Sequence, residues 1–296
     1  MNKKLFSVLI LFLISYPVIA SQNGSSDEKP LSKTNWIEIC KRDGGEKDCG
    51  GDESTVNHYF KAYKANYLLP WSQAEPEIED RMSLEVKFQI SIQQMLFELW
   101  DFDLSIGYTQ KSFWQTYDQD KSRPFRETNY NPEIFIKTPE LNTLGTNWKA
   151  IIGYEHESNG ENLPYSKSWD RFYSRLMVHF DGFHLDYKLW YRIPEKKKED
   201  ANDPEGDDNP DIADYYGFSE ATIDIYIGEG LLSMFARLNP VEEKGAYQLD
   251  FSYPFPGKRI YWYLQYWNGY GESLIDYNRR LSRFGIGIMV TRPQIY

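Results

Sequence analysis

Strict alternation of apolar and polar residues, repeated in segments of about ten residues, constrains the fold of this chain more than any other feature. Residues 84–92 place apolar side chains at even positions and polar ones at odd positions, and residues 100–108 repeat this order. Successive side chains of a β-strand point to opposite faces, so each segment predicts a strand with one apolar and one polar face. Similar segments lie at 183–193, 223–227, 247–253, 260–266 and 284–290.

Aromatic residues, which make up 17% of the chain, gather at the ends of these segments. Alternating strands with aromatic ends are typical of outer-membrane barrels, in which one face of each strand meets lipid and the other meets the lumen. A soluble β-sandwich also alternates, but it does not call for so many Tyr and Trp at strand ends. With a further strand expected near 59–69, the spacing accommodates about twelve strands. We therefore predict an all-β fold, a twelve-stranded antiparallel transmembrane β-barrel, over residues 56–296.

The first 55 residues do not share this alternation. Residues 1–20 combine two lysines, an apolar run and a small-residue site, which together predict a cleaved signal peptide. A membrane anchor is the alternative, but the run is short for a spanning helix. Residues 21–55 are polar and predict a flexible periplasmic extension. Cys40 and Cys49 lie in this extension, and behind a secretory signal we expect them to form a local disulfide.

The lengths of the connections predict how the barrel is oriented. Asp181-Gly182 reads as a tight turn, whereas residues 111–131, 159–169 and 194–219 read as long connections. Outer-membrane barrels have short periplasmic turns and long extracellular loops, so we expect 159–169 to be extracellular, beside 111–131. The net charge of −11 argues against a nucleic-acid partner, which would need a basic face.

A base, a nucleophile and an acidic residue occur close together in the sequence. They are His156, Ser158 and Asp170. His156 and Ser158 are two residues apart, so on a strand both leave the same face. A serine becomes nucleophilic beside a base, and a histidine needs a third group to fix its tautomer. The H-x-S pattern alone has low specificity, and the parity of the surrounding strands must decide its meaning.

That parity places all three side chains on the lipid-facing side. His156 and Ser158 share the parity of Trp148, Ala150, Ile152 and Tyr154, while Asp170 shares that of Phe172, Leu176, Val178 and Phe180. On the lumen face, Arg171 and Arg175 can meet Glu155 and Glu157. Polar groups that face a bilayer are costly and by default functional. We therefore predict a Ser-His-Asp triad that faces the outer leaflet.

Longer blocks of sequence carry a family resemblance. They are NYL at 66–68, YTQKS at 108–112, PFRETNY at 124–130, HESNG at 156–160, SKSW at 166–169, DNPDI at 208–212 and GYGESLIDY at 269–277. With these blocks, most of the chain after residue 56 resembles the outer membrane phospholipase A enzymes of Gram-negative bacteria. The resemblance implies a twelve-stranded barrel that hydrolyses acyl ester bonds of phospholipids and lysophospholipids (phospholipase A1 and A2 activity). It also implies dependence on Ca²⁺ and activity as a homodimer.

The resemblance also assigns catalytic roles. It implies that His156 is the general base, that Ser158 is the nucleophile, and that Asp170 orients the histidine. Family members usually have Asn at this last position; either side chain accepts a hydrogen bond from an imidazole, and an ionised Asp also stabilises the imidazolium. The backbone N–H of Gly160 is the expected oxyanion donor, helped by a calcium-bound water.

Calcium and dimer residues follow in the same way. The resemblance implies as calcium ligands the hydroxyl of Ser166 and the carbonyl of Glu161 from one protomer, with the carbonyl of Ser122 from the other. The family has Arg where this chain has Glu161, but the ligand is a backbone oxygen, so the change need not abolish the site. All-oxygen ligation suits a hard cation. Gln110, with lipid-facing parity, maps to the dimer contact. The acidic residues of 198–211 are expected to form a solvated loop, from which Asp208 could add a secondary calcium contact.

Two alternatives stay open on sequence. A passive porin or transporter would explain the barrel but not the outward-facing triad. An outer-membrane protease would keep its catalytic groups in an aqueous cleft, and its lipid-facing positions would stay apolar.

Overall fold

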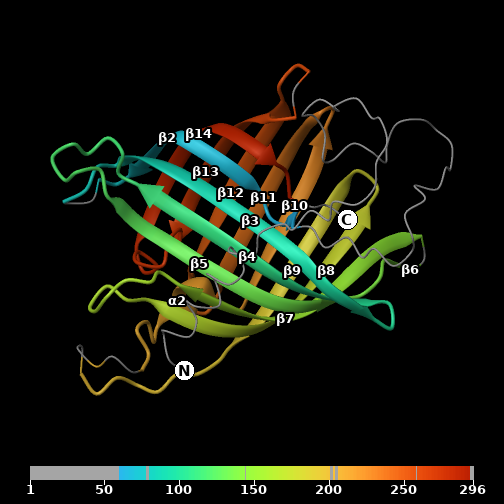
Figure 1. The fold of residues 1–296 in the computed structure, drawn as a ribbon, viewed down its shortest axis with the longest axis horizontal. Helices are drawn as coiled ribbons and strands as arrows, with labels where there is room; N and C mark the ends of the chain where they lie inside the picture. The colour runs from blue at the N-terminus through green and yellow to red at the C-terminus, as the bar shows by residue number, and fades with distance from the viewer. Residues whose placement is uncertain are drawn as a thin grey trace, which may run out of the picture. The chain divides into compact units, whose positions relative to one another are not determined.

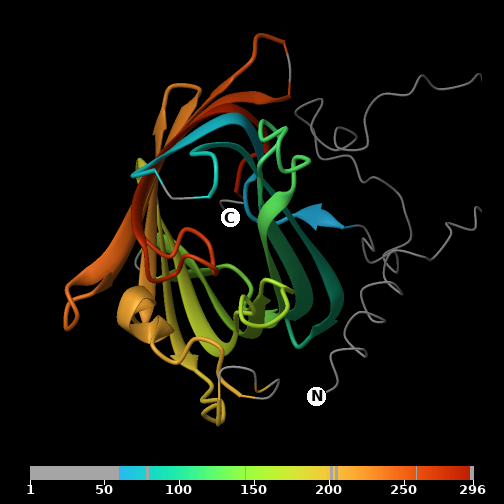
Figure 2. The same cartoon turned by 90° about the vertical axis from the view of Figure 1, so that its left-hand side faces the viewer.

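The computed structural model describes residues 60–293, apart from 78, 79, 144, 201, 202, 204, 205 and 258. Within this part of the chain, twelve antiparallel strands form a closed barrel, as predicted (Figures 1 and 2). The predicted signal peptide, the extension at 21–55 and the Cys40–Cys49 disulfide lie outside the described residues, so they stay predictions. Among the described residues, no helix has the length and apolar character needed to cross a membrane.

The wall follows the order of the chain, with each strand hydrogen-bonded to the next. Its strands are β2 (Asn66–Glu75), β3 (Leu84–Leu99), β4 (Phe102–Trp114), β5 (Phe125–Lys137), β7 (Thr146–Ser158), β8 (Ser168–Phe180), β9 (Phe183–Arg192), β10 (Ser219–Ile227), β11 (Gly230–Asn239), β12 (Lys244–Pro254), β13 (Tyr261–Tyr270) and β14 (Arg280–Thr291). The ring closes where β14 pairs with β2. Two short strands, β1 (Lys61–Ala62) and β6 (Leu141–Thr143), pair with β3 and β7. One short helix, α2 (Ile212–Tyr216), lies between β9 and β10.

The predicted alternation gives the wall two chemically different faces. On β7, Ile152 is 70% exposed on the outer face, whereas its neighbour Ile151 is 1% exposed on the inner face. Other outward-facing apolar side chains are Ile90, Ile134, Phe172, Leu189, Leu264 and Ile286. In a barrel with a lipid-facing exterior these side chains are not a defect, because hydrocarbon is their solvent.

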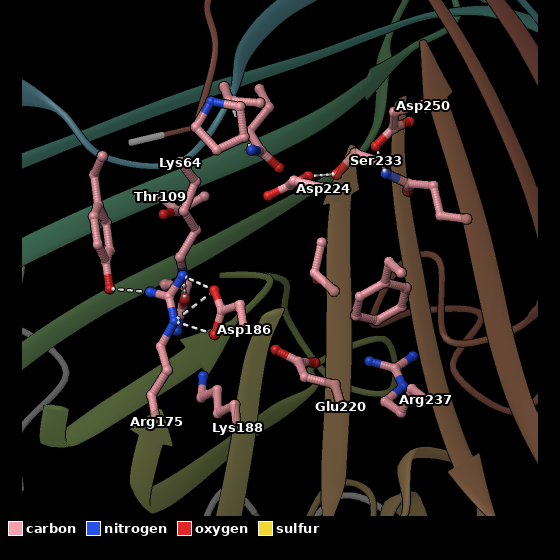
Figure 3. Close-up of a pocket in the computed structure, with 18 of the residues that line it drawn as sticks. Lys64, Thr109, Arg175, Asp186, Lys188, Glu220, Asp224, Ser233, Arg237 and Asp250 are labelled. Carbon is pink, nitrogen blue, oxygen red and sulfur yellow. Dashed lines mark hydrogen bonds and ion pairs between the residues drawn. The ribbon is translucent and has the colours of Figure 1, made fainter. Parts of the chain in front are cut away.

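The lumen is polar and held by ion pairs. Arg171 contacts Glu155 and Glu157 at 3.1 and 3.0 Å, as the parity predicted. Arg175 also points inward, but it pairs with Asp186 on β9 rather than with the two glutamates (Figure 3). The reason is register, because β8 and β9 bring these two residues to neighbouring levels of the wall. A charge buried in a barrel needs such a partner, because removal of either member would leave the other charge buried and unpaired.

The longest connections share one end of the barrel, as expected, but the division by length is incomplete. That end has 76–83, 115–124, 159–167, 193–218 and 271–279 together with the short 240–243. The other end has the turns 100–101, 181–182 and 228–229 together with the longer 138–145 and 255–260. The predicted loop 111–131 was too long, because β4 continues to Trp114 and β5 begins at Phe125. The first wall strand is also later than expected: β2 spans Asn66–Glu75, and only β1 falls in the earlier half of 59–69.

The long connections pack on one another at their end of the barrel. Ile212 and Tyr216 of α2 are buried in one cluster with Trp169, Leu274 and Tyr277. The prediction that 198–211 is a solvated acidic loop does not hold for its last residues. Asp207 pairs with Arg192 at 2.6 Å, and the hydroxyl of Tyr277 donates to Asp211. These contacts fix the loops that surround the predicted site.

Candidate active site

The hairpin of β7 and β8 brings two of the three predicted catalytic residues into contact. His156 and Asp170 are directly paired across the two strands. The Nδ1 atom of His156 lies 2.9 Å from Oδ1 of Asp170, and the two side chains are 27% and 28% exposed. Ser158, the last residue of β7, lies two positions further along the same face and pairs with Ser168 of β8. The sequence predicted that these side chains share the outer face, and the β7–β8 register places His156 opposite Asp170.

Tyr154 is a polar group at this site that sequence reasoning gave no role. It precedes His156 by two residues on β7, and its hydroxyl donates to Oδ1 of Asp170 at 2.5 Å. Two donors thus converge on one carboxylate oxygen, because the same atom faces the imidazole. The parity pattern contained a signal for it, since Tyr154 was among the lipid-facing residues, but the pattern could not show that its hydroxyl meets Asp170.

The connection after β9 adds a carboxyl group near the pair. The backbone N–H of Ile193 donates to the carbonyl of Asp170 at 2.9 Å, which seats the start of this connection against β8. Burial, and then the negative charges of Asp207 and Asp170, raise the pKa of Glu195 to about 7. Glu195 is therefore partly protonated near neutral pH, which limits the negative charge that it adds beside Asp170.

Asn159 organises the loop that follows Ser158. It is buried, and its backbone N–H donates to the carbonyl of Lys167 at 3.0 Å. Its side-chain oxygen accepts from the N–H of Lys167 at 2.9 Å, and its amide donates to the carbonyl of Tyr165 at 2.9 Å. One side chain thus ties the two ends of the loop 159–167 together. Asn159 stands in the HESNG motif, but the hydropathy of a loop does not indicate that one of its polar side chains is buried and bonded on several sides.

Gly160, the predicted oxyanion donor, has a backbone conformation that favours glycine. Its φ is +70°, and a Cβ there would lie 3.2 Å from Cε2 of Tyr130. Larger residues are strained at positive φ. The structure therefore explains why glycine follows Asn159 at the turn that leaves β7.

The three predicted calcium ligands are divided between two loops. Ser166 and Glu161 lie in the 159–167 loop, whereas Ser122 lies in the connection between β4 and β5. The hydroxyl of Ser166 donates to Oδ2 of Asp208 at 2.6 Å, and Oδ1 of Asp208 pairs with Lys198 at 2.5 Å. Among the described residues, no three His, Cys, Asp or Glu side chains gather as metal ligands. The hydroxyl of Ser166 and the carboxylate of Asp208 nevertheless lie in contact, and oxygen donors of this kind fit calcium.

Gln110, the predicted dimer residue, lies on the same row of the outer wall as Ser158. The register pairs Gln110 with Tyr130 of β5, and Tyr130 with Ser158 of β7. Within its own strand, the amide of Gln110 accepts from the hydroxyl of Tyr108 at 3.0 Å and donates to Ser112 at 3.1 Å. These bonds satisfy a polar side chain that would otherwise face lipid unpaired.

Comparisons with known proteins agree with this geometry. Residues 50–290 match the phospholipase A1 family. The chain is 38% identical over 214 residues to phospholipase A1 of Escherichia coli (strain K12), a match that covers 70% of this chain and 69% of that protein.

Solved structures show the same fold. The outer membrane phospholipase A from Escherichia coli is 34% identical, with a TM-score of 0.72 over 79% of this chain and 98% of that one. A Salmonella typhi outer membrane phospholipase (OMPLA), a dimer with bound calcium, is 34% identical with a TM-score of 0.73, covering 81% and 95% of the two chains. The predicted resemblance is thus confirmed, and this chain belongs to the phospholipase A1 family as a bacterial outer-membrane β-barrel phospholipase.

Proposed function

We propose that this protein is a calcium-dependent phospholipase, active as a homodimer, that uses Ser158, His156 and Asp170 to hydrolyse acyl esters of phospholipids and lysophospholipids. The observation that carries the proposal is the contact of 2.9 Å between His156 and Asp170 on the outer face of β7 and β8. A passive porin has no use for a base and its orienting carboxylate on a surface that faces lipid. Phospholipid is the substrate that such a surface meets directly.

The arrangement supports acyl transfer to serine. The hydroxyl oxygen of Ser158 attacks the ester carbonyl carbon while its proton passes to Nε2 of His156. Asp170 holds Nδ1 of the ring and stabilises the imidazolium that forms. His156 then gives the proton to the departing alcohol, which leaves an acyl group on Ser158. His156 next takes a proton from water, whose oxygen adds to the acyl carbonyl carbon. The bond to the Ser158 oxygen then breaks, the fatty acid leaves, and the proton on His156 returns to Ser158. The backbone N–H of Gly160 is the proposed donor to the oxyanion.

The calcium ligands are proposed to come from two protomers. Ser166 would contribute its hydroxyl and Glu161 its carbonyl, and the partner's Ser122 would contribute its carbonyl. The Salmonella typhi relative, a dimer with bound calcium, supports the proposal of calcium and a dimer. Asp208, which lies 2.6 Å from the hydroxyl of Ser166, is a further oxygen donor at the same place. When bound there, calcium supplies positive charge beside the loop that carries Gly160. Gln110 is the proposed dimer contact.

Hydrolysis by purified protein tests the proposed function. Full-length protein, refolded in detergent, is expected to release fatty acid from phospholipid and lysophospholipid micelles with calcium and to stop when a chelator is added. Ion conductance across a planar bilayer is measured in parallel. Conductance without hydrolysis in either condition would overturn the proposal in favour of a porin.

Two substitutions at Asp170 separate its geometric role from its charge. Asp170→Asn keeps an oxygen that accepts from the imidazole, and the family usually has Asn at this position. Exchanging a charged acceptor for a neutral one is expected to keep kcat within about tenfold of the original. Asp170→Ala removes the acceptor and is expected to lower kcat much further. The measurement is kcat and kcat/KM at saturating calcium, with circular dichroism to confirm that both variants are folded. Equal losses for Asn and Ala would show instead that the negative charge itself is required.

A further inference from the structure

The three polar residues Tyr154, His156 and Ser158 follow one another on the outer face of β7. Tyr154 does more than add an aromatic ring to the outer face of the wall, because its hydroxyl lies 2.5 Å from Oδ1 of Asp170. The imidazole of His156 lies 2.9 Å from that same oxygen. One carboxylate oxygen of Asp170 therefore lies in contact with both the phenol of Tyr154 and the imidazole of His156.

A carboxylate in this place needs more than one donor. Asp170 belongs to a strand whose outward-facing neighbours are Phe172 and Leu176, both exposed to the surroundings of the wall. An ionised carboxylate at such a surface loses hydration, and hydrogen bonds to the charged form are what compensates it. The phenol of Tyr154 supplies such a bond independently of the protonation of His156. Because its direction is fixed by β7, it also limits the rotation of the Asp170 side chain.

We propose that Tyr154 is a positioning residue: its hydroxyl holds Asp170 in the orientation that His156 requires and shares the negative charge of that carboxylate. This inference rests on the proposed function, since it extends the Ser158–His156–Asp170 set by one member. Tyr154 touches no reacting atom in this scheme. It acts through Asp170, and its contribution therefore depends on what stands at position 170.

If Tyr154 had only a packing role, loss of its hydroxyl would leave activity unchanged. Its ring packs on that of Phe172, with the ring centroids 5.7 Å apart, and this contact does not require the hydroxyl. Tyr154→Phe keeps the ring and removes only the hydrogen bond. Tyr191 of β9 provides the matched control, because the register places Tyr154, Phe172 and Tyr191 in one row and Tyr191 is 64% exposed.

Tyr154→Phe is expected to lower kcat by about tenfold, the effect of losing one hydrogen bond to a charged group, with little change in KM. The low-pH limb of the kcat/KM profile is expected to move to higher pH. Without the phenol, the carboxylate charge acts more fully on His156 and favours its protonated form. Tyr191→Phe is expected to change neither kcat nor the pH profile. Circular dichroism and thermal unfolding show whether each variant remains folded.

A double-mutant cycle with Asp170→Asn completes the test. A neutral amide oxygen accepts a weaker bond than a carboxylate, so Tyr154→Phe is expected to cost about threefold or less in the Asp170→Asn background. Equal losses in both backgrounds, or a folded Tyr154→Phe protein with unchanged kcat and pH profile, would overturn the inference. Hydrolysis by the original protein would then still support the proposed function. If the original protein hydrolyses no phospholipid, the proposed function fails, and the inference fails with it.

Discussion

Ser158→Ala is expected to lower kcat for phospholipid hydrolysis by about 10³-fold or more, the largest effect expected of any single substitution in this chain. The hydroxyl of Ser158 is the proposed nucleophile, and alanine leaves no group that could form the acyl intermediate. The barrel should stay folded, because Ser158 is the last residue of β7 and the change removes one oxygen. The measurement is the initial rate of fatty-acid release at saturating calcium, with circular dichroism as the test of folding.

Ser168→Ala is the matched control for this substitution. Ser168 is the direct partner of Ser158 in the β7–β8 register, so it is a serine at the same level of the wall. Its replacement should leave turnover near the original value. A sulfonyl reagent that blocks turnover should label Ser158 in the original protein. Labelling of another serine together with loss of turnover would show that the nucleophile has been wrongly assigned.

Ser166→Ala is expected to weaken calcium activation and dimerisation together. It removes the proposed side-chain ligand, so the calcium concentration for half-maximal activity should rise by about tenfold or more, with excess calcium restoring part of the turnover. A metal held by two protomers binds the dimer better than the monomer, and by linkage calcium must then favour the dimer. Calcium titration of activity measures the first effect. Sedimentation in detergent, with and without calcium and a covalent acyl inhibitor, measures the second.

Two other substitutions make this test specific. Ser122→Ala keeps the backbone carbonyl that is proposed to bind calcium, so it should behave like the original protein. Gln110→Ala should weaken the dimer in sedimentation and, because the site is shared, raise the calcium concentration for half-maximal activity, while turnover at saturating calcium stays near the original value. A fully active monomer that is indifferent to a chelator would refute the shared calcium site and leave only the triad to be tested.

Some wall strands were not visible as alternating segments. In β5, polar residues hold lipid-facing positions, among them Thr128, which contacts the hydroxyl of Ser112 on β4. This row of polar residues made the ends of β4 and β5 resemble a loop, and it explains why 111–131 was predicted to be longer than the observed connection. In β11 the opposite occurs, because apolar residues hold lumen-facing positions. Leu231 and Phe235 point inward, and Phe235 packs on Trp267. Hydropathy therefore assigns the two faces of a strand correctly only where the lipid-facing residues are apolar and the lumen-facing residues are polar.

The sequence by itself determined the barrel and the face on which His156, Ser158 and Asp170 lie. Both follow from local geometry, since the direction of a side chain on a strand depends only on parity. Only the tertiary structure decided which residues meet. The contact of His156 with Asp170 depends on the β7–β8 register. The contacts of Tyr154 with Asp170 and of Ser166 with Asp208 depend on side-chain reach and on a loop 42 residues away in the chain. Register and loop packing are set by the sum of many contacts along the whole wall, and no local pattern of residues encodes them.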